Sequence, residues 1–396
     1  VTAALMALFA TMFWRLRSRV GPIAILVSFA LAYINLQPFI LARPHVLAWP
    51  VLALWTVLML KYRDEGRVPP LALALLMFAW SNLHGSYFAG FLVAAAISLD
   101  AVISARWDRK VIGGWFLFGL AILLASMINA NGLAGLLHPI SISSMETLPE
   151  IGEWQPSTFR VTPIFFLTVL VVFGALLLRR PKFRLGELGL VLLTLAMALT
   201  HLRHQSIFII VATLIVTPKL AGSGRSRAVP IFGSPREARL WAAGAVAAAV
   251  VIVGVRMAVP FQPDDSVSYP QTLIAHIPPE LRSKPVLNEY SMGGPLILAG
   301  IRPYIDGRAD MYGDAFVRDY LKITGGDWAT FGKAVDRYGL RWTILQNNNG
   351  LVRELDKSGE WRRIYSDKVG VIHVRRGSPS AAPHPRADDA QRQNGR

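Results

Sequence analysis

The sequence predicts a polytopic α-helical membrane protein of about ten spans with an external α/β domain at its C-terminal end. Three observations support this class: long apolar segments, basic residues confined to alternate connectors, and soluble-domain patterning after residue 260. Hydrophobic residues make up 53% of the chain, which is typical of a protein whose core faces lipid. The absence of cysteine excludes disulfides and thiolate chemistry, so the external domain must fold on its apolar core alone.

Apolar segments occupy most of the first 259 residues. They cover 1–13, 20–41, 45–60, 69–83, 86–104, 111–138, 162–178, 185–200, 205–218 and 240–259. Several are shorter than the ~20 residues that a perpendicular helical crossing needs. Polar residues interrupt the 111–138 segment at 129–132, so we expect a span there followed by a short re-entrant or interfacial helix.

Basic residues indicate which connectors face the cytoplasm. The connectors after the first, third, fifth, seventh and ninth segments carry eighteen lysines and arginines, whereas the others carry only Arg43, Arg160 and Arg203. The positive-inside rule therefore places the second group, and everything after residue 260, outside the cytoplasm. The net charge of +16 then serves as membrane anchoring, and we expect no nucleic-acid partner. Since segment one would run inward, we also expect an odd number of spans before Val1.

Residues 260–376 have the pattern of a small soluble α/β domain. We expect strands at 285–290, 302–305, 342–346, 362–365 and 369–374, and helices at 315–323 and 328–338. Residues 377–396 contain almost nothing that could be buried, which predicts a disordered tail. The expected domains are thus a helical membrane domain at 1–259, an external domain at 260–376, and the tail.

All five histidines of the membrane region fall at the outer side in this topology. They are His45, His84, His138, His201 and His204, and the arginines Arg43 and Arg203 and the asparagines Asn82, Asn129 and Asn131 lie near them in sequence. Polar groups at membrane depth usually face a bundle interior or a wet cavity, which favours an outward-facing pocket. The alternative is hydrogen bonding of single side chains near the lipid headgroups.

Two arginines suggest a site for a lipid phosphate. Arg43 and His45 lie in a short turn between two apolar segments, and the guanidinium fork matches phosphate oxygens. His201, Arg203 and His204 join two other segments and could form a phosphate-binding cluster. Snorkelling of Arg43 to the headgroups remains open, as do a divalent-cation site or a structural role for the two histidines, although Arg203 would repel a cation.

The connector at 139–161 holds the candidate catalytic carboxylates. Glu150 and Glu153 could act as a general base or hold a cation, but acidic external loops also arise because basic residues are kept inside. Trp154 could be a membrane-interface anchor or a platform on which a sugar stacks.

Polar residues in the external domain follow two predicted strands. Glu289 and Tyr290 follow the first, and Asp306, Arg308 and Asp310 follow the second. Open α/β sheets bind ligands at the carboxyl ends of their strands, so these residues are candidates for an acceptor site. A local ion-pair network that fixes the turn is the alternative for Asp306, Arg308 and Asp310.

These features resemble the GT-C superfamily of integral-membrane glycosyltransferases, which use polyprenyl-phosphate-linked sugars. The stretches 80–85, 151–154, 288–294 and 304–313 are similar to those of a group of bacterial membrane proteins with the same layout, and the resemblance covers most of residues 1–376. It implies an inner-membrane glycosyltransferase, transferring a hexose or pentose, with the C-terminal domain extracytoplasmic. Its partners would be a polyprenyl-phosphate sugar donor and membrane lipids; no cofactor follows from it beyond the divalent cation already considered.

One feature of the superfamily has no counterpart in this chain. GT-C enzymes carry a catalytic aspartate in the first external loop, after their first span, and here segment one has the direction of their second span. The resemblance therefore implies that the catalytic acid lies upstream of Val1 or is absent. A non-catalytic glycolipid-binding or envelope-assembly protein is the second interpretation. A transporter is disfavoured, because alternating access needs a midplane site and Asp100 lies near the cytoplasmic end.

Overall fold

The computed structural model describes residues 1–41, 43–143, 145–147, 150, 152–221, 234–259 and 264–377. Contacts divide the chain into two compact units, one formed by 1–144 and 148–245 and the other by 145–147 and 246–396. The predicted tail at 377–396 lies outside the described residues except for Gly377, as do the side chains of His138 and Asp310.

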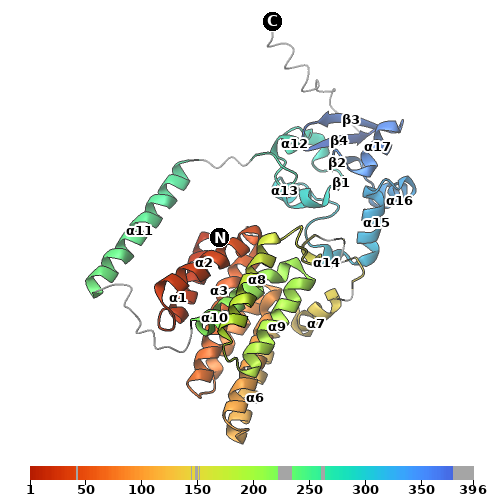
Figure 1. The fold of residues 1–396 in the computed structure, drawn as a ribbon. Helices are drawn as coiled ribbons and strands as arrows, with labels where there is room; N and C mark the ends of the chain where they lie inside the picture. Colours follow the sequence, from red (N-terminus) through yellow and green to blue (C-terminus); the bar gives the residue numbers. More distant parts are fainter. Residues whose placement is uncertain are drawn as a thin grey trace. The chain divides into compact units, whose positions relative to one another are not determined.

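The first unit consists of helices and their connecting turns, with no strand among its described residues. Its helices are α1 (Thr2–Leu16), α2 (Pro22–Leu36), α3 (Pro44–Asp64), α4 (Ala74–Leu83), α5 (Phe88–Ser104), α6 (Arg109–Ser126), α7 (Gly132–Ser143), α8 (Pro163–Arg179), α9 (Leu185–Thr200) and α10 (Gln205–Leu220). A further helix, α11 (Pro235–Ala258), contains the boundary between the units. Figure 1 shows α9 and α10 running side by side.

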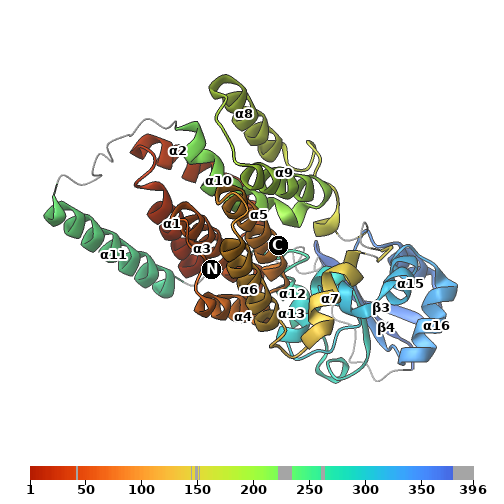
Figure 2. The same ribbon diagram turned by 90° about the horizontal axis from the view of Figure 1, so that it is seen from below.

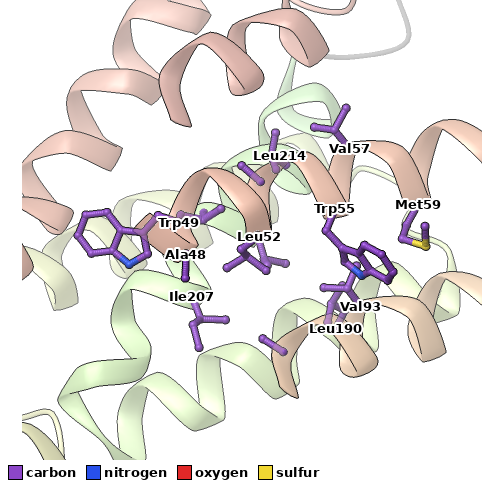
Figure 3. Close-up of a cluster of buried hydrophobic side chains, with 14 of the residues drawn as sticks. Ala48, Trp49, Leu52, Trp55, Val57, Met59, Val93, Leu190, Ile207 and Leu214 are labelled. Carbon is purple, nitrogen blue, oxygen red and sulfur yellow. The ribbon is translucent and has the colours of Figure 1, made fainter. Parts of the chain in front are cut away.

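Helix α3 is the centre of the first unit. It packs against α1, α4, α5 and α10, and its side chains Trp49, Leu52 and Trp55 are almost completely buried. Figure 3 shows this cluster, in which Val93, Leu190, Ile207 and Leu214 come from α5, α9 and α10. The indole nitrogen of Trp55 donates to the carbonyl oxygen of Gly90 at 2.9 Å, so even this buried ring has its polar atom paired. Because α1, α4, α5 and α10 all pack on α3, this core fixes where the ends of these helices lie relative to one another.

Each of the ten apolar segments of the sequence is helical, and the break at 129–132 separates α6 from α7 as expected. Among the described residues, four helical stretches are long and apolar enough to cross a membrane: Pro22–Phe39, Pro44–Asp64, Gly85–Ser104 and Arg109–Ser126. Shorter apolar helices, such as α8, expose large side chains; Leu170 is 64% and Leu178 is 87% exposed. Such outward apolar faces are favourable in lipid and unfavourable in water.

The second unit contains a four-stranded sheet covered by helices on both faces. The strands are β1 (Val286–Asn288), β2 (Trp342–Gln346), β3 (Trp361–Ser366) and β4 (Gly370–Arg375), in the order β1-β2-β4-β3, with β1 parallel to β2 and the other pairs antiparallel. Helices α15 (Asp314–Thr324), α16 (Trp328–Tyr338) and α17 (Gly350–Lys357) pack on one face, and α12 (Gln271–Ala275) and α13 (Gly293–Leu298) on the other. Figure 2 shows α15 and α16 beside β3 and β4.

One predicted strand, at 302–305, is wrong. The Asn288 side chain takes the place of a strand ladder: its Oδ1 accepts from the backbone N–H of Tyr304 at 2.7 Å, and its Nδ2 donates to the carbonyl oxygen of Ile305 at 2.8 Å. The buried amide of Asn288 therefore supplies hydrogen-bond partners for the backbone of Tyr304 and Ile305, and no fifth strand forms there. Gly293 permits the close approach, because a Cβ there would lie 2.5 Å from the Ile305 oxygen.

Candidate functional site

Six side chains from four places in the sequence gather at one end of the first unit. We call them the histidine–arginine cluster: His45, His84, Trp154, His201, Arg203 and His204. His45 lies in the first turn of α3, and His84 joins α4 to the 3-10 turn η3 (Gly85–Tyr87). Trp154 ends the turn η5 (Gly152–Trp154), and the other three lie between α9 and α10, in and beside the turn η6 (Leu202–His204). The predicted outer histidines with described side chains thus share one end of the unit.

The indole ring of Trp154 is at the centre of the cluster. The guanidinium carbon of Arg203 lies 4.3 Å from the ring centroid, and the rings of His201 and His204 lie at 5.3 and 6.1 Å. Nδ1 of His201 donates to the carbonyl oxygen of Trp154 at 2.8 Å. This indole therefore positions the arginine and both histidines of the α9–α10 connection, in addition to any contact with lipid or sugar.

A buried polar pair fixes the loop that carries Trp154. Nε2 of Gln205 donates to the hydroxyl oxygen of Ser157 at 2.8 Å, and that hydroxyl donates to the carbonyl oxygen of Ala198. The backbone N–H of Leu202 donates to the carbonyl oxygen of Gln155 at 3.0 Å. Sequence reasoning missed Gln205 and Ser157; a glutamine at the start of an apolar helix was the available signal. These bonds hold the loop against both helices.

His45 and His84 form the other side of the cluster. Their ring centroids are 6.2 Å apart, and Nε2 of His45 donates to the carbonyl oxygen of Phe39 at 2.8 Å. Nδ1 of His84 accepts from the backbone N–H of Ser86 at 3.0 Å, so neutral His84 carries its proton on Nε2. That N–H is therefore a donor which the local backbone does not use.

Burial keeps two of the imidazoles neutral. Burial, together with the nearby positive charge of Arg203, lowers the pKa of His84 to about 4 and that of His204 to about 4. Arg203 is also close enough to His45 to interact with it electrostatically. Near pH 7 the cluster thus combines the Arg203 guanidinium with the uncharged imidazoles of His84 and His204. Such a set can donate hydrogen bonds to an anion without the mutual repulsion of several adjacent cations.

The candidate carboxylates differ in their surroundings. Glu153 accepts from Arg43 at 3.2 Å, and both side chains are roughly half exposed. An ion pair this exposed contributes little to stability, but it joins the start of α3 to the loop that carries Trp154. Glu150 is exposed. Glu153 is thus held by Arg43, whereas Glu150 is open to solvent.

Asn82 and the asparagines near it support the backbone. Nδ2 of Asn82 donates to the carbonyl oxygens of Phe78 and Ile128, each at 2.9 Å, which ties α4 to the end of α6. Oδ1 of Asn129 accepts from the backbone N–H groups of Asn131 and Gly132. These contacts account for asparagines at the helix junctions.

The candidate residues of the external domain lie in the second unit. Oε2 of Glu289 accepts from the backbone N–H of Gln346 at 3.3 Å and from Asn349 at 3.0 Å, so it ties the ends of β1 and β2 together. The backbone N–H of Tyr290 donates to the Tyr320 hydroxyl at 2.7 Å. Both contacts have a clear structural role at the carboxyl ends of the two strands.

Asp306 and Arg308 form a local ion pair in the turn after Ile305. The Asp306 side chain is 5% exposed and accepts from both the backbone N–H and the guanidinium of Arg308. The hydrogen bonds from Arg308 lower the pKa of Asp306, although its burial acts in the opposite direction. Asp306 and Arg308 thus make the local ion pair that the sequence offered as the alternative to an acceptor site. The side chain of Asp310 lies outside the described residues.

Among the described residues, no group of three or more histidine, aspartate or glutamate side chains is arranged to hold a metal ion. The His201–His204 pair has ring centroids 5.4 Å apart, and Arg203 lies between the two residues in the chain. A guanidinium beside two imidazoles favours an anion over a cation. A scan against models of protein families and a search of curated proteins each found no match to this chain.

Proposed function

We propose that this chain is the membrane core and external domain of a bacterial inner-membrane glycosyltransferase with a polyprenyl-phosphate-linked sugar donor. In this proposal ten helical segments cross or enter the membrane, the histidine–arginine cluster faces outward, and the α/β domain is extracytoplasmic. The observation that carries the proposal is the convergence of Arg203 and the imidazoles of His201 and His204 around Trp154. Guanidinium and imidazole donors suit the phosphate of a lipid-linked donor, which becomes the leaving group during transfer.

The cluster's residues have distinct proposed roles. Arg203 binds the donor phosphate, and the Nε2–H of His84 donates a hydrogen bond to the same group. Both contacts stabilise the negative charge that develops on the phosphate as the glycosidic bond breaks. Arg43 orients Glu153 at the edge of the cluster. Glu150 and Glu153 are the candidate carboxylates that could activate an acceptor hydroxyl.

Transfer can be measured on the purified full chain in lipid nanodiscs. Polyprenyl-phosphate sugars of several hexoses and pentoses would be supplied, and release of free polyprenyl phosphate would be followed with and without an acceptor glycan. We expect release from at least one donor and its loss in Arg203→Ala. Arg160→Ala is the matched control, because Arg160 is an exposed arginine assigned to the same side.

Binding without release defines the second candidate, a glycolipid-binding envelope protein. The engagement of Glu153 by Arg43 favours it, because one of the two candidate carboxylates is held in an ion pair and not directed at an acceptor. A chain that retains donor lipid but releases no polyprenyl phosphate with any sugar would favour this candidate. Failure to bind polyprenyl phosphate at all would exclude both functions.

A further inference from the structure

A buried ion-pair core lies at the opposite ends of the helices that carry the histidine–arginine cluster. Arg63, whose side chain is 3% exposed, donates to Asp100 at 3.1 Å, and its guanidinium lies 2.9 Å from Glu187 and 2.7 Å from Asp64. The side chains of Asp100 and Glu187 are 1% and 4% exposed. These residues come from α3, α5 and α9, so three helices meet in one set of charges.

The carboxylates of this core are already engaged by the protein. Asp100 accepts from the backbone N–H groups of Gly186 at 2.6 Å and Glu187 at 3.1 Å, at the N-terminus of α9 where unpaired amides need an acceptor. Gly186 is required for this contact, because a Cβ would lie 1.9 Å from the carbonyl oxygen of Ala96. The acidic groups are therefore held inside, facing their partners.

The basic groups extend beyond the core and surround a cavity. The cavity has a volume of about 180 Å³, and Arg15, Arg19, Arg184 and Lys219 line it together with Arg63. Asp64 and Glu187 are the carboxylates on its wall. Even when Asp100 is counted behind them, five cationic side chains face three carboxylates, which leaves an excess of two positive charges.

The surroundings of Arg15 show that the described residues do not neutralise this excess of positive charge. Its side chain is 9% exposed and lines the cavity, and its Nε atom is buried with no hydrogen-bond partner in the part of the chain that the structure describes. Arg15 and Arg19 also share a single oxygen, Oδ2 of Asp64, at 3.1 and 3.0 Å. A guanidinium this buried, which shares one carboxylate oxygen with a second arginine, is costly, and an anion that accepted from its terminal N–H groups in the cavity would reduce that cost.

We propose that this cavity binds a phosphate group carrying about two negative charges, held by Arg15 and Arg19 with Lys219 beside it. The arginine forks match phosphate oxygens, and Lys219, which lies 2.7 Å from Glu187, is only 26% exposed. The phosphate belongs either to a soluble phosphate ester or to the headgroup of an anionic lipid. This site is separate from the proposed donor site, because it uses the opposite ends of α3, α9 and α10.

Thermal unfolding of the full chain in nanodiscs distinguishes the two sources of phosphate. In nanodiscs of phosphatidylcholine alone, a soluble-phosphate site predicts a saturable rise in Tm with inorganic phosphate that chloride at equal ionic strength does not produce. A headgroup site predicts instead a saturable rise with small fractions of phosphatidylglycerol. Either response supports the proposal if Arg15→Gln and Arg19→Gln each weaken it at least tenfold.

Arg17→Gln is the matched control, since Arg17 is an exposed arginine of the same segment that does not line the cavity. It should leave the response unchanged. Arg19 is 33% exposed, so its replacement preserves folding even if Arg15→Gln does not. The proposal is overturned if neither phosphate nor phosphatidylglycerol raises Tm saturably. It is also overturned if the response persists in Arg19→Gln, or if Arg17→Gln weakens it equally.

Discussion

The guanidinium of Arg203 lies over the indole ring of Trp154, 4.3 Å from its centroid. The two residues are far apart in the sequence, and the contact depends on the loop at 152–157 packing against the start of α10. A cation held over an aromatic face cannot move freely to the headgroups, so simple snorkelling describes this arginine poorly.

Replacing Arg203 should weaken the binding of polyprenyl phosphate. We expect Arg203→Ala to lose ~2–4 kcal/mol of binding free energy, the range for losing a charge-assisted contact in a partly buried site. Arg203→Lys should restore only part of it, because an ammonium group cannot reproduce a two-pronged contact. Binding isotherms of the purified variants would show this order. Equal affinities for all three proteins would remove Arg203 from the site.

The C-terminal domain should be extracytoplasmic. The basis is the excess of basic residues in alternate connectors, eighteen against three. A reporter enzyme that is active only outside the cytoplasm, fused after Arg376, should therefore be active. Activity of a cytoplasm-only reporter at the same position would reverse the topology and move the histidine–arginine cluster to the inner side.

Residues 260–376 should fold without the helical unit. Both faces of the sheet are covered by buried side chains from helices of the same segment, and together these form two apolar clusters. The isolated segment should unfold cooperatively on heating, and adding residues 377–396 should not change its Tm. A featureless circular dichroism spectrum would contradict this. Thr147, whose hydroxyl donates to Asp314 at 2.7 Å, would be the first contact to restore in a longer segment.

The stability of this domain should fall as the pH is lowered below about 6.5, the ordinary pKa of histidine. His373 is fully buried, and burial lowers its pKa although Asp356, 2.9 Å away, acts in the opposite direction. The unfolded chain therefore binds a proton first, and stability is lost between pH 6.5 and the lower folded-state value, by up to about 1.4 kcal/mol per pH unit. Urea unfolding at pH 7.5, 6.5 and 5.5 would measure it. The slope should shrink in His373→Gln, and an unchanged slope would assign the effect to other groups.

Asn288→Ala should destabilise the domain by about 3 kcal/mol. The substitution leaves the backbone N–H of Tyr304 and the carbonyl oxygen of Ile305 without their partner, in a place where Asn288 itself is fully buried. Asn347→Ala is the comparison, because Asn347 is exposed and makes one hydrogen bond, to the carbonyl oxygen of Asp367. It should cost less than about 1 kcal/mol. Similar urea midpoints for both variants would show that the 302–305 segment does not depend on Asn288.

Much of the fold follows from hydrophobic patterning, because a helix in lipid or a strand in a core needs a continuous apolar face. That pattern predicts the helices of all ten apolar segments and four of the five expected strands. It fails at 302–305, where a side-chain amide replaces a backbone ladder, a substitution that periodicity does not reveal.

The candidate site could be predicted in part. The histidines with described side chains share one end of the helices, as the alternation of connector charge predicts. The buried ion-pair core could not be predicted, because Arg63, Asp100 and Glu187 are far apart in sequence and meet only through packing. The feature of the sequence that could have marked Glu187 as part of an ion pair was its position inside an apolar segment.

Helix α3 connects the two polar regions, since Arg43 and His45 lie at its start and Arg63 and Asp64 at its end. Twenty residues at 1.5 Å of rise separate the two arginines, a span of about 30 Å, which matches the hydrocarbon thickness of an ordinary bilayer. In the proposed topology, the length of α3 therefore matches a bilayer in which Arg43 reaches the headgroups at one surface while the buried ion-pair core around Arg63 lies near the other. A thicker bilayer would force thinning around the protein, and a thinner one would force α3 to tilt.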